Sequence, residues 1–220
     1  MLLKEHSWDI KLNHKNGLSY YTIKNIFDED EIERFYHIFN QVKPHLLPPE
    51  HSGSALDENK KPLKNNKAIF TDKIKPYPGI FLDFEKKLGF HRNKMYDLLG
   101  DNKEDSVYAL LPSNINTWNS LISYYCEDNH NYKAHSDNSI LTFLMWLDER
   151  EKNFTGGELR FPKYDITIEC EDNTGVLFPS RVLHEVLDVK IIDKNKDKGR
   201  ITYSTFLGND IFLNNSKVKR

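Results

Sequence analysis

Cysteine is scarce in this chain, and several features that define protein classes are missing. Only two cysteines occur among 220 residues, Cys126 and Cys170, too few for a disulfide framework or a four-sulfur zinc site. No run approaches the roughly 18 apolar residues of a membrane span, and the first ten residues lack the apolar core of a signal peptide. A single Cys126–Cys170 bridge stays open, but we expect a reduced, cytoplasmic protein that contacts no membrane.

The charge balance is also close to neutral. A formal net charge of −2 disfavours a general nucleic-acid-binding protein. Apolar residues make up 38% of the chain and charged residues 29%, which is typical of a globular protein rather than a disordered one. The length suits one domain with a full core, so we expect a single domain over residues 1–220.

The first half of the chain, residues 1–116, predicts supporting elements. Residues 18–27 are rich in β-branched and aromatic side chains and predict a first strand. Asp28 and Glu31 have the spacing of a capping box, and the apolar residues after them recur at helical spacing. These features predict a helix over residues 29–42.

A long irregular segment follows this helix. Residues 43–66 contain four prolines and one glycine among many lysines and asparagines, so they predict either an ordered binding loop or lid, or a disordered segment. Ala68–Thr71 has the composition of a short strand, and Pro76–Gly79 that of a turn. The apolar spacing of residues 80–99 predicts a second helix.

From about residue 117 the pattern changes to short β-rich runs separated by turn residues. Closely spaced strands without intervening helices indicate an antiparallel sandwich or barrel. The fold class is therefore α+β, with a β core over residues 117–208. The runs are TWNSLISYY, ILTFLMWL, ELRF, DITIEC, GVLF, LHEVLDVKII and RITYSTFL.

Two histidines and one aspartate have the spacing of a metal site. His135 and Asp137 are two residues apart, so on an extended strand their side chains share one face. His184 lies in a strongly apolar run after a Phe-Pro-Ser turn, although a single histidine there is more often a core residue than a ligand. Two histidines and one carboxylate form the facial triad of non-haem Fe(II), which leaves three positions open.

Arg200 is the candidate partner for an anionic ligand. It begins the run RITYSTFL, and its planar guanidinium can bind a carboxylate through two hydrogen bonds. We expect this strand to form a hairpin with the strand of His184, which would place Arg200 and His184 within the length of one small molecule. In isolation, a charged residue at a strand end is more often simply solvated.

With these residues in order, the C-terminal half resembles the 2-oxoglutarate/Fe(II) dioxygenase superfamily, specifically its prolyl 4-hydroxylase-like branch. The resemblance covers roughly residues 117–208. It rests on the ordered set His-x-Asp, TGGELRFP, GVLFPSRVLHEV and GRITYSTFLG, together with Tyr125 and Tyr132. The segment YYTIKNIFDEDEIERFY is also similar to the N-terminal support of that branch.

The resemblance implies a double-stranded β-helix, also called a jelly roll or cupin-like core, with supporting N-terminal helices. It implies that His135, Asp137 and His184 are iron ligands and that Arg200 anchors the C5 carboxylate of 2-oxoglutarate. The resemblance also implies further contacts to this co-substrate from Tyr125, Trp146 and Thr202. Tyr124 competes with Tyr125, because strand register turns only one of them inward.

Three departures from the family pattern bear on these roles. The segment between His184 and Arg200 is longer than usual and is rich in lysine and aspartate, so it predicts a lengthened hairpin loop, with Lys198 as a rival anchor. Trp146 occupies a position where related enzymes place a tyrosine. The run between Asp137 and Leu141 is short, which predicts a more open pocket edge. Gly156 and Gly157 are expected to serve a tight turn rather than chemistry.

The implied activity is hydroxylation of a C–H bond, with O2 and 2-oxoglutarate consumed, succinate and CO2 released, and ascorbate as a possible reductant. A peptidyl substrate of the prolyl hydroxylase type is the first expectation. A free amino acid or metabolite is the alternative within the superfamily, and a non-enzymatic metal-binding jelly roll is the alternative outside it. A nucleic-acid demethylase is disfavoured, because Phe206 occupies the position of that group's second arginine. Asp137 favours hydroxylation over halogenation.

Overall fold

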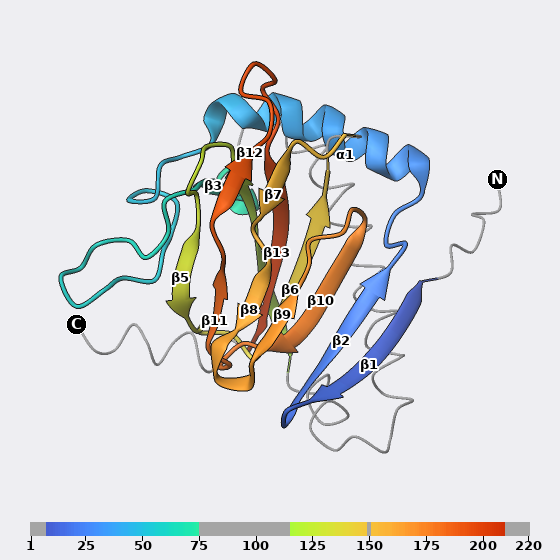
Figure 1. Ribbon diagram of the computed structural model, residues 1–220, viewed down its shortest axis with the longest axis vertical. Helices are drawn as coiled ribbons and strands as arrows, with labels where there is room; N and C mark the ends of the chain where they lie inside the picture. Colours follow the sequence, from blue (N-terminus) through green and yellow to red (C-terminus); the bar gives the residue numbers. More distant parts are fainter. Residues whose placement is uncertain (1–7, 75–114, 149–150, 210–220) are drawn as a thin grey trace.

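Two facing β-sheets and one long helix make up most of the computed structural model, which describes residues 8–74, 115–148 and 151–209. The larger sheet has the order β1-β2-β10-β6-β13-β4-β3, and a four-stranded sheet has the order β5-β11-β8-β9. A two-stranded ribbon pairs β12 with β7. All pairings are antiparallel. The predicted double-stranded β-helix core is confirmed (Figure 1).

The strands have the following bounds. The larger sheet contains β1 (Asp9–Lys15), β2 (Leu18–Lys24), β3 (Lys67–Phe70), β4 (Thr117–Tyr125), β6 (Leu141–Leu147), β10 (Thr174–Pro179) and β13 (Arg200–Gly208). The smaller sheet contains β5 (Tyr132–His135), β8 (Leu159–Phe161), β9 (Ile166–Ile168) and β11 (His184–Val186). The ribbon contains β7 (Phe154–Gly156) and β12 (Val189–Ile191).

Helix α1 (Glu29–Val42) has the predicted bounds, and its capping box is formed. The Asp28 side chain accepts a hydrogen bond from the Glu31 backbone N–H at 2.9 Å, and the Glu31 side chain accepts one from the Asp28 backbone N–H at 3.1 Å. These contacts satisfy donors that a helix start leaves unpaired. Short 3-10 turns follow at η1 (Lys43–His45), η2 (Thr71–Lys73) and η4 (Pro162–Tyr164).

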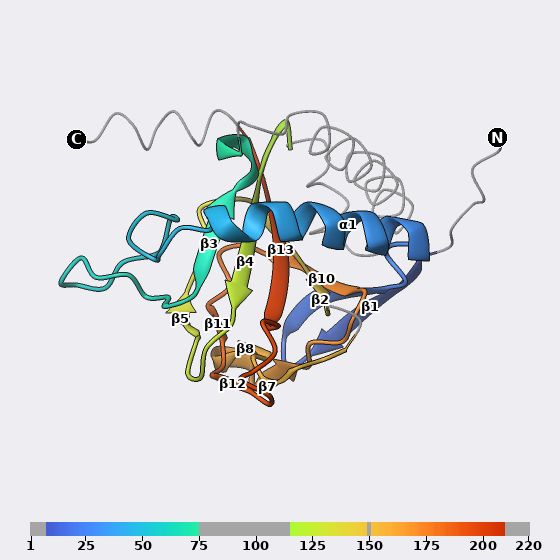
Figure 2. The same ribbon diagram turned by 90° about the horizontal axis from the view of Figure 1, so that it is seen from above.

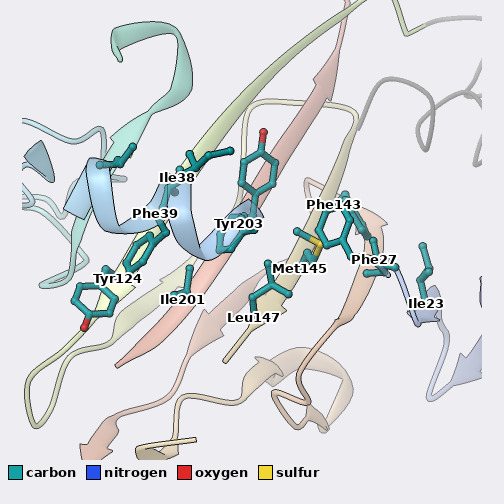
Figure 3. Packing of buried hydrophobic residues seen from close by; sticks show 14 of the residues in the cluster. Ile23, Phe27, Ile38, Phe39, Tyr124, Phe143, Met145, Leu147, Ile201 and Tyr203 are labelled. Carbon is teal, nitrogen blue, oxygen red and sulfur yellow. The ribbon is translucent and has the colours of Figure 1, made fainter. Parts of the chain in front are cut away.

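The apolar side of α1 covers the outer face of the larger sheet (Figure 2). Phe35, Ile38, Phe39 and Val42 are buried in this layer. Figure 3 shows Phe39 beside Tyr124, Ile201 and Tyr203 of the central strands, and the Phe39 and Tyr124 ring centroids are 5.2 Å apart. Burying each large apolar side chain contributes about 1.5–3 kcal/mol, so this layer fixes the sheet against its support.

Alternation along β13 divides its residues between this outer layer and the interior. Ile201 and Tyr203 belong to the cluster under α1, whereas Arg200, Thr202 and Ser204 line a cavity on the other face. The same alternation along β4 places Tyr124 outward and Tyr125 inward, as the period of two along a strand requires. Polar side chains therefore reach the space between the two sheets.

Residues 43–66 form an ordered loop rather than a disordered segment. Leu47 forms a β-bridge with Ala68, and Lys64 forms one with Tyr132. The backbone N–H of Leu63 donates to the carbonyl of Ala55 at 2.9 Å, which closes the distal turn of the loop. The loop is thus tied at both of its ends to the β core (Figure 1).

Three expectations about strands need correction. The strand predicted over residues 18–27 is present as β2 (Leu18–Lys24), but it is not the first, because β1 precedes it and pairs with it along its whole length. The run from Leu183 to Ile192 is two short strands, β11 and β12, which belong to different sheets. The expected hairpin between the strands of His184 and Arg200 is absent: β13 pairs with β4 and β6, whereas β11 pairs with β5 and β8.

The remaining expectations concern β3, residues 76–99, the cysteines and membrane-spanning helices. The predicted strand at Ala68–Thr71 is confirmed as β3, one residue earlier. The turn at Pro76–Gly79 and the helix over 80–99 lie outside the described residues. Both cysteines are free thiols, so no bridge joins Cys126 to Cys170. Among the described residues, no helix combines the length and apolar character that crossing a bilayer requires.

Candidate metal centre

Strands β5 and β11 place two buried histidines side by side. His135 ends β5, and His184, the first residue of β11, is its register partner. Directly opposite residues of an antiparallel pair point to the same face. The two imidazole centroids are accordingly 4.3 Å apart. The exposed fractions are 7% for His135 and 3% for His184.

Asp137 completes the group two residues after His135. Its backbone N–H donates to the Ser180 carbonyl at 2.9 Å, which fixes the chain where β5 ends. Its carboxylate oxygens lie 3.7 Å from His135 Nε2 and 3.5 Å from His184 Nε2. The three potential ligand atoms lie within 4.8 Å of one another. The structure therefore brings together the three residues that the sequence predicted as a metal site.

Backbone carbonyls set the tautomers of both histidines. His135 Nδ1 lies 2.8 Å from the Lys133 carbonyl, and His184 Nδ1 lies 2.9 Å from the Val182 carbonyl. A carbonyl can only accept, so each Nδ1 carries a proton and donates it. Each Nε2 then keeps its lone pair, which is the arrangement of a metal-binding histidine with a supporting hydrogen bond.

The protonation states also suit a cation. Burial, and secondarily His184, lowers the pKa of His135 to about 3, so this imidazole is neutral at neutral pH. Burial raises the pKa of the Asp137 carboxyl. Among the described residues, the ion-pair partners of Asp137 are the two histidines alone. Two imidazole lone pairs and a buried carboxylate thus converge where a divalent cation would supply the missing positive charge.

A hydroxyl network supports Asp137 from behind. Thr142 Oγ1 donates to Asp137 Oδ2 at 2.7 Å. The Ser180 hydroxyl lies 2.8 Å from that of Thr142 and 2.7 Å from that of Ser139. Outer contacts of this kind orient metal ligands. Sequence reasoning did not find Thr142 or Ser180, because neither has a motif spacing that distinguishes it from an ordinary strand hydroxyl.

Arg200 approaches the same space from the opposite sheet. It is 1% exposed, and its Nε donates to Cys170 Sγ at 3.2 Å while Nη1 donates to Thr202 Oγ1 at 2.5 Å. The guanidinium carbon lies 4.6 Å from the centroid of the Tyr125 ring. Nη2 is buried and has no hydrogen-bond partner among the described residues. A buried guanidinium with an unpaired nitrogen is costly unless an anionic ligand supplies the acceptor.

Gly157 leaves the space that the Arg200 side chain occupies. A Cβ added to Gly157 would lie 2.6 Å from Arg200 Cδ, and its φ of +74° is one that side chains rarely adopt. Gly156 has a φ of +75°, and a Cβ added to it would collide with the Asp188 carbonyl. The expectation that both glycines serve only a turn is therefore too narrow, because Gly157 also makes room beside the arginine.

One cavity connects these two groups of residues. Its volume is about 300 Å³, and its lining includes the three candidate ligands together with Tyr125, Arg200 and Thr202. Burial raises the pKa of Tyr125 to about 12, so its hydroxyl is protonated at neutral pH. The cavity therefore combines a metal-binding group beside the smaller sheet with a cationic group on the larger sheet. That arrangement fits a small dicarboxylate with a chelating end.

Residues 120–207 match the model of the 2OG-Fe(II) oxygenase superfamily. The matched segment extends from β4 to β13 and contains the triad, Tyr125 and Arg200. This segment is therefore similar to the 2OG-Fe(II) oxygenase superfamily. The initials 2OG stand for 2-oxoglutarate, the dicarboxylate that the cavity geometry suggests. A search of curated proteins gives no significant match.

Solved structures similar to this chain include several prolyl hydroxylases. A prolyl-4-hydroxylase from Pseudomonas putida is 15% identical with a TM-score of 0.56, covering 86% of this chain and 92% of that one. A viral collagen prolyl hydroxylase from Paramecium Bursaria Chlorella virus-1, in its 2OG complex, is 16% identical with a TM-score of 0.52, covering 86% and 94%.

A prolyl hydroxylase from Trichoplax adhaerens, solved with a peptide fragment of the hypoxia inducible factor oxygen degradation domain, is 12% identical. Its TM-score is 0.60, and the match covers 88% of this chain and 84% of that one. At these identities the similarity shows the fold. The fold of this chain is therefore similar to that of these prolyl hydroxylases.

The structure places the competing candidate residues around different cavities. Tyr125 lines the cavity of the triad, whereas Tyr124 packs under α1 and lines a different cavity. Lys198 also lines that second cavity, and its Nζ lies 3.8 Å from Glu151 Oε2. Arg200, rather than Lys198, is therefore the cation beside the triad.

Trp146 lies next to the pocket without lining it. It is 1% exposed and belongs to the interior cluster, but it is not among the described residues around the cavity. Its register partner on β13 is Thr202, which does line the cavity. The indole Nε1 is buried without a hydrogen-bond partner among the described residues. A contact between Trp146 and the co-substrate stays a prediction.

Two residues with no assigned role contact the predicted ones. The Tyr132 ring stacks on the imidazole of His135, with centroids 3.6 Å apart and planes at 14°. Its hydroxyl accepts a hydrogen bond from the Ala55 backbone N–H at 2.8 Å, so it ties the loop to the metal centre. Cys170 accepts from Arg200 and donates to the Gly157 carbonyl at 2.9 Å. The Cys170 contact carried no sequence signal, because it depends on strands distant in sequence.

Proposed function

We propose that this chain is an Fe(II)- and 2-oxoglutarate-dependent dioxygenase that hydroxylates a C–H bond, with residues 1–220 forming one domain. The observation that supports this most strongly is the shared cavity of the triad and the unpaired Arg200 Nη2. A structural metal site alone would need no buried guanidinium with a free donor beside it. The superfamily match over residues 120–207 supports the same reaction class.

The triad would hold the iron. His135 and His184 would bind it through Nε2, since each Nδ1 donates to a backbone carbonyl, and Asp137 through a carboxylate oxygen. Three protein ligands leave positions open for a chelating co-substrate and O2. When bound, the iron and 2-oxoglutarate supply the oxidation that releases succinate and CO2 and hydroxylates the substrate.

The residues on β13 and β4 would orient the co-substrate. Arg200 would bind its far carboxylate through Nη2, because Nε and Nη1 already donate to Cys170 and Thr202. The protonated hydroxyl of Tyr125 is a further donor at that end. Thr202 would act mainly by holding the guanidinium, since its hydroxyl accepts from Nη1. These contacts place the binding energy at the end of the molecule remote from the reacting atoms.

We propose a peptidyl residue, with proline preferred, as the target. Support comes from the loop over residues 43–66, whose Gly53, Ser54 and Ala55 line the mouth of the cavity, and from the Trichoplax adhaerens relative solved with a peptide. A loop that borders an open cavity can contact an extended chain. The alternative substrate is a free amino acid or metabolite. Free thiols at Cys126 and Cys170 agree with a reducing, cytoplasmic setting.

The test is succinate formation from 2-oxoglutarate by the purified protein with Fe(II), O2 and ascorbate, without a prime substrate. We expect slow succinate release by the native chain and none by Asp137→Ala. Lys163→Ala, an exposed change outside the site, is the matched control. A chain that binds metal but neither binds nor consumes 2-oxoglutarate would instead be a metal-binding jelly roll, and the proposal would be wrong.

Substrate class is tested with the same assay. Proline-containing peptides and free proline are each added, and succinate release is measured. Peptide-dependent stimulation supports the peptidyl target, whereas stimulation by free proline alone assigns the enzyme to small molecules.

A further inference from the structure

A second cavity, larger than that of the metal centre, lies on the opposite face of the same strands. Its volume is about 820 Å³, and it is bounded by three parts of the chain. The end of α1 with η1 forms one wall, β3 and β4 a second, and the loop between β12 and β13 a third. In Figure 1 this loop rises from β12 beside α1. The volume falls in the range of small-molecule sites, about 300–1,000 Å³.

Positive charge is concentrated on this cavity. Among the described residues that line it, four are lysines and one is an aspartate; the lysines are Lys43, Lys67, Lys196 and Lys198. The chain as a whole has a net charge of −2, so the excess is local. Lysines converging on a concave surface raise the local concentration of anions.

The carboxylates near these lysines leave them able to bind an anion. Asp197, Glu127 and Glu151 pair with the lysines at 2.8–3.8 Å, and their side chains are 87%, 63% and 62% exposed. Exposed pairs of this kind contribute only about 0–1 kcal/mol each. A ligand with several negative charges can therefore displace them at small cost.

The ammonium group of Lys43 is held in place at this cavity. Its side chain is 17% exposed, and Nζ donates to the Asp197 carbonyl at 2.6 Å. Nζ also lies 4.8 Å from the centroid of the Tyr124 ring. One cationic group is thus preorganised, while Lys67, Lys196 and Lys198 retain partly exposed side chains that can close on a ligand.

The third wall is the segment that the sequence set apart from the oxygenase family. The lengthened run between β12 and β13 supplies Lys196, Asp197 and Lys198, and the metal centre uses none of them. Gly199 packs closely on the backbone at the end of β4, since a Cβ added to it would collide with the Tyr125 carbonyl. The next residue, Arg200, lines the metal-centre cavity on the opposite face of the sheet. The extra residues therefore build a separate cavity rather than part of the pocket.

From this charge, volume and placement, we propose that the cavity binds a phosphate-bearing small anion of up to nucleotide size. Ammonium groups suit phosphate as compact point charges. Two sources share this chemistry: a nucleoside phosphate, or a free polyphosphate such as pyrophosphate. The apolar rings of Tyr36 and Tyr124 in the lining favour the nucleoside phosphate.

The experiment is isothermal titration of the full chain with ATP, pyrophosphate and inorganic phosphate in separate runs. We expect ATP and pyrophosphate to bind, and their affinity to fall as salt is raised. The double variant Lys196→Gln, Lys198→Gln should weaken binding about tenfold. The matched control is Lys11→Gln, Lys163→Gln, which removes two exposed charges outside the cavity and should leave affinity within about twofold.

Comparison of the titrants distinguishes a nucleoside phosphate from a free polyphosphate. Tighter binding of ATP than pyrophosphate assigns a nucleoside phosphate, and equal affinities assign a free polyphosphate. A repeat with excess 2-oxoglutarate should leave ATP affinity unchanged, because Arg200 lines the other cavity. Absence of binding, equal loss in the two double variants, or displacement by 2-oxoglutarate would each overturn the proposal. None of these outcomes depends on oxygenase activity.

Discussion

The guanidinium of Arg200 is held by residues from three parts of the chain. Cys170 accepts a hydrogen bond from Nε, and Thr202 accepts one from Nη1. The guanidinium carbon lies over the Tyr125 ring. Gly157 leaves room for the stem and accepts from the Cys170 thiol through its carbonyl. At this scale the site is a set of contacts that leaves one buried nitrogen, Nη2, without a hydrogen-bond partner among the described residues.

Replacing Cys170 tests whether this orientation matters. Cys170→Ala removes the acceptor of Arg200 Nε, and we expect 2-oxoglutarate binding to weaken about threefold to tenfold. Cys170→Ser keeps a donor and an acceptor and should restore most of the affinity. Equilibrium binding of 2-oxoglutarate to the Fe(II)-loaded protein measures the effect. If native protein binds 2-oxoglutarate and the alanine variant binds it equally well, the thiol has no positioning role.

Gly157→Ala should be more damaging. The new Cβ would meet Arg200 Cδ at 2.6 Å, and the φ of +74° adds backbone strain. We expect a loss of about 1–3 kcal/mol in unfolding free energy, together with weaker 2-oxoglutarate binding. Urea denaturation measures the first quantity and titration the second. A variant with native stability and native binding would show that the backbone can shift without cost.

At the scale of the element, α1 shows how far local sequence determines structure. Its bounds, Glu29–Val42, and its capping box follow from spacing alone, because both depend on neighbouring residues. Strands β4, β6, β10 and β13 were likewise found from composition. The division of residues 183–192 into β11 and β12 was not predicted. A single apolar run can contribute strands to two different sheets when the pairing is interrupted within it.

Removal of the helix cap is the prediction at this scale. Asp28→Ala leaves the Glu31 backbone N–H without its acceptor, and we expect a loss of about 1 kcal/mol in unfolding free energy. Asp28→Ser should recover most of it, since serine can also cap. Thermal or chemical denaturation provides the comparison. Equal stability of the alanine and serine variants would mean that tertiary packing alone holds the helix start.

The candidate site shows what spacing cannot predict. His135, Asp137, His184 and Arg200 were all identified from the sequence, yet the reason given for Arg200 was wrong. It reaches the triad across the space between two sheets, not through a hairpin with β11. The contacts of Thr142 and Cys170 were missed because segments distant in sequence create them, and that of Tyr132 because its stacking on His135 has no distinguishing spacing. Trp146 was selected by position in the motif; it is buried next to the cavity-lining Thr202, and its contact with a co-substrate stays a prediction.

For the whole molecule, the loop over residues 43–66 is held together internally by a buried charge. Lys64 is 3% exposed and donates to the Ser52 carbonyl at 3.1 Å. Burial lowers its pKa to about 8, from a usual value of 10.5. Between these values the unfolded chain binds more protons than the folded one. The free energy of unfolding therefore rises as pH increases from about 8 toward 10.5. Below pH 8 the buried charge destabilises the folded chain by its full amount.

Lys64→Met removes that dependence. We expect the stability difference between native and variant protein to change by roughly 2 kcal/mol between pH 7.5 and 9.5, with native protein gaining at the higher pH. The variant is the more stable of the two at the lower pH, provided that methionine fills the space of the lysine stem. Urea denaturation at both pH values measures this. Parallel curves for the two proteins would show that Lys64 does not titrate in this range.

The account as a whole depends on one cavity that holds both a metal and a dicarboxylate. Its most direct test is an anaerobic titration of the purified chain with Fe(II), followed by 2-oxoglutarate, read by equilibrium metal content and visible absorption. The account predicts one Fe(II) per chain and a new absorption band that appears only when 2-oxoglutarate is added, with metal binding lost in His135→Ala. Stoichiometric metal without any 2-oxoglutarate-dependent band, or undiminished metal binding in the variant, would contradict it.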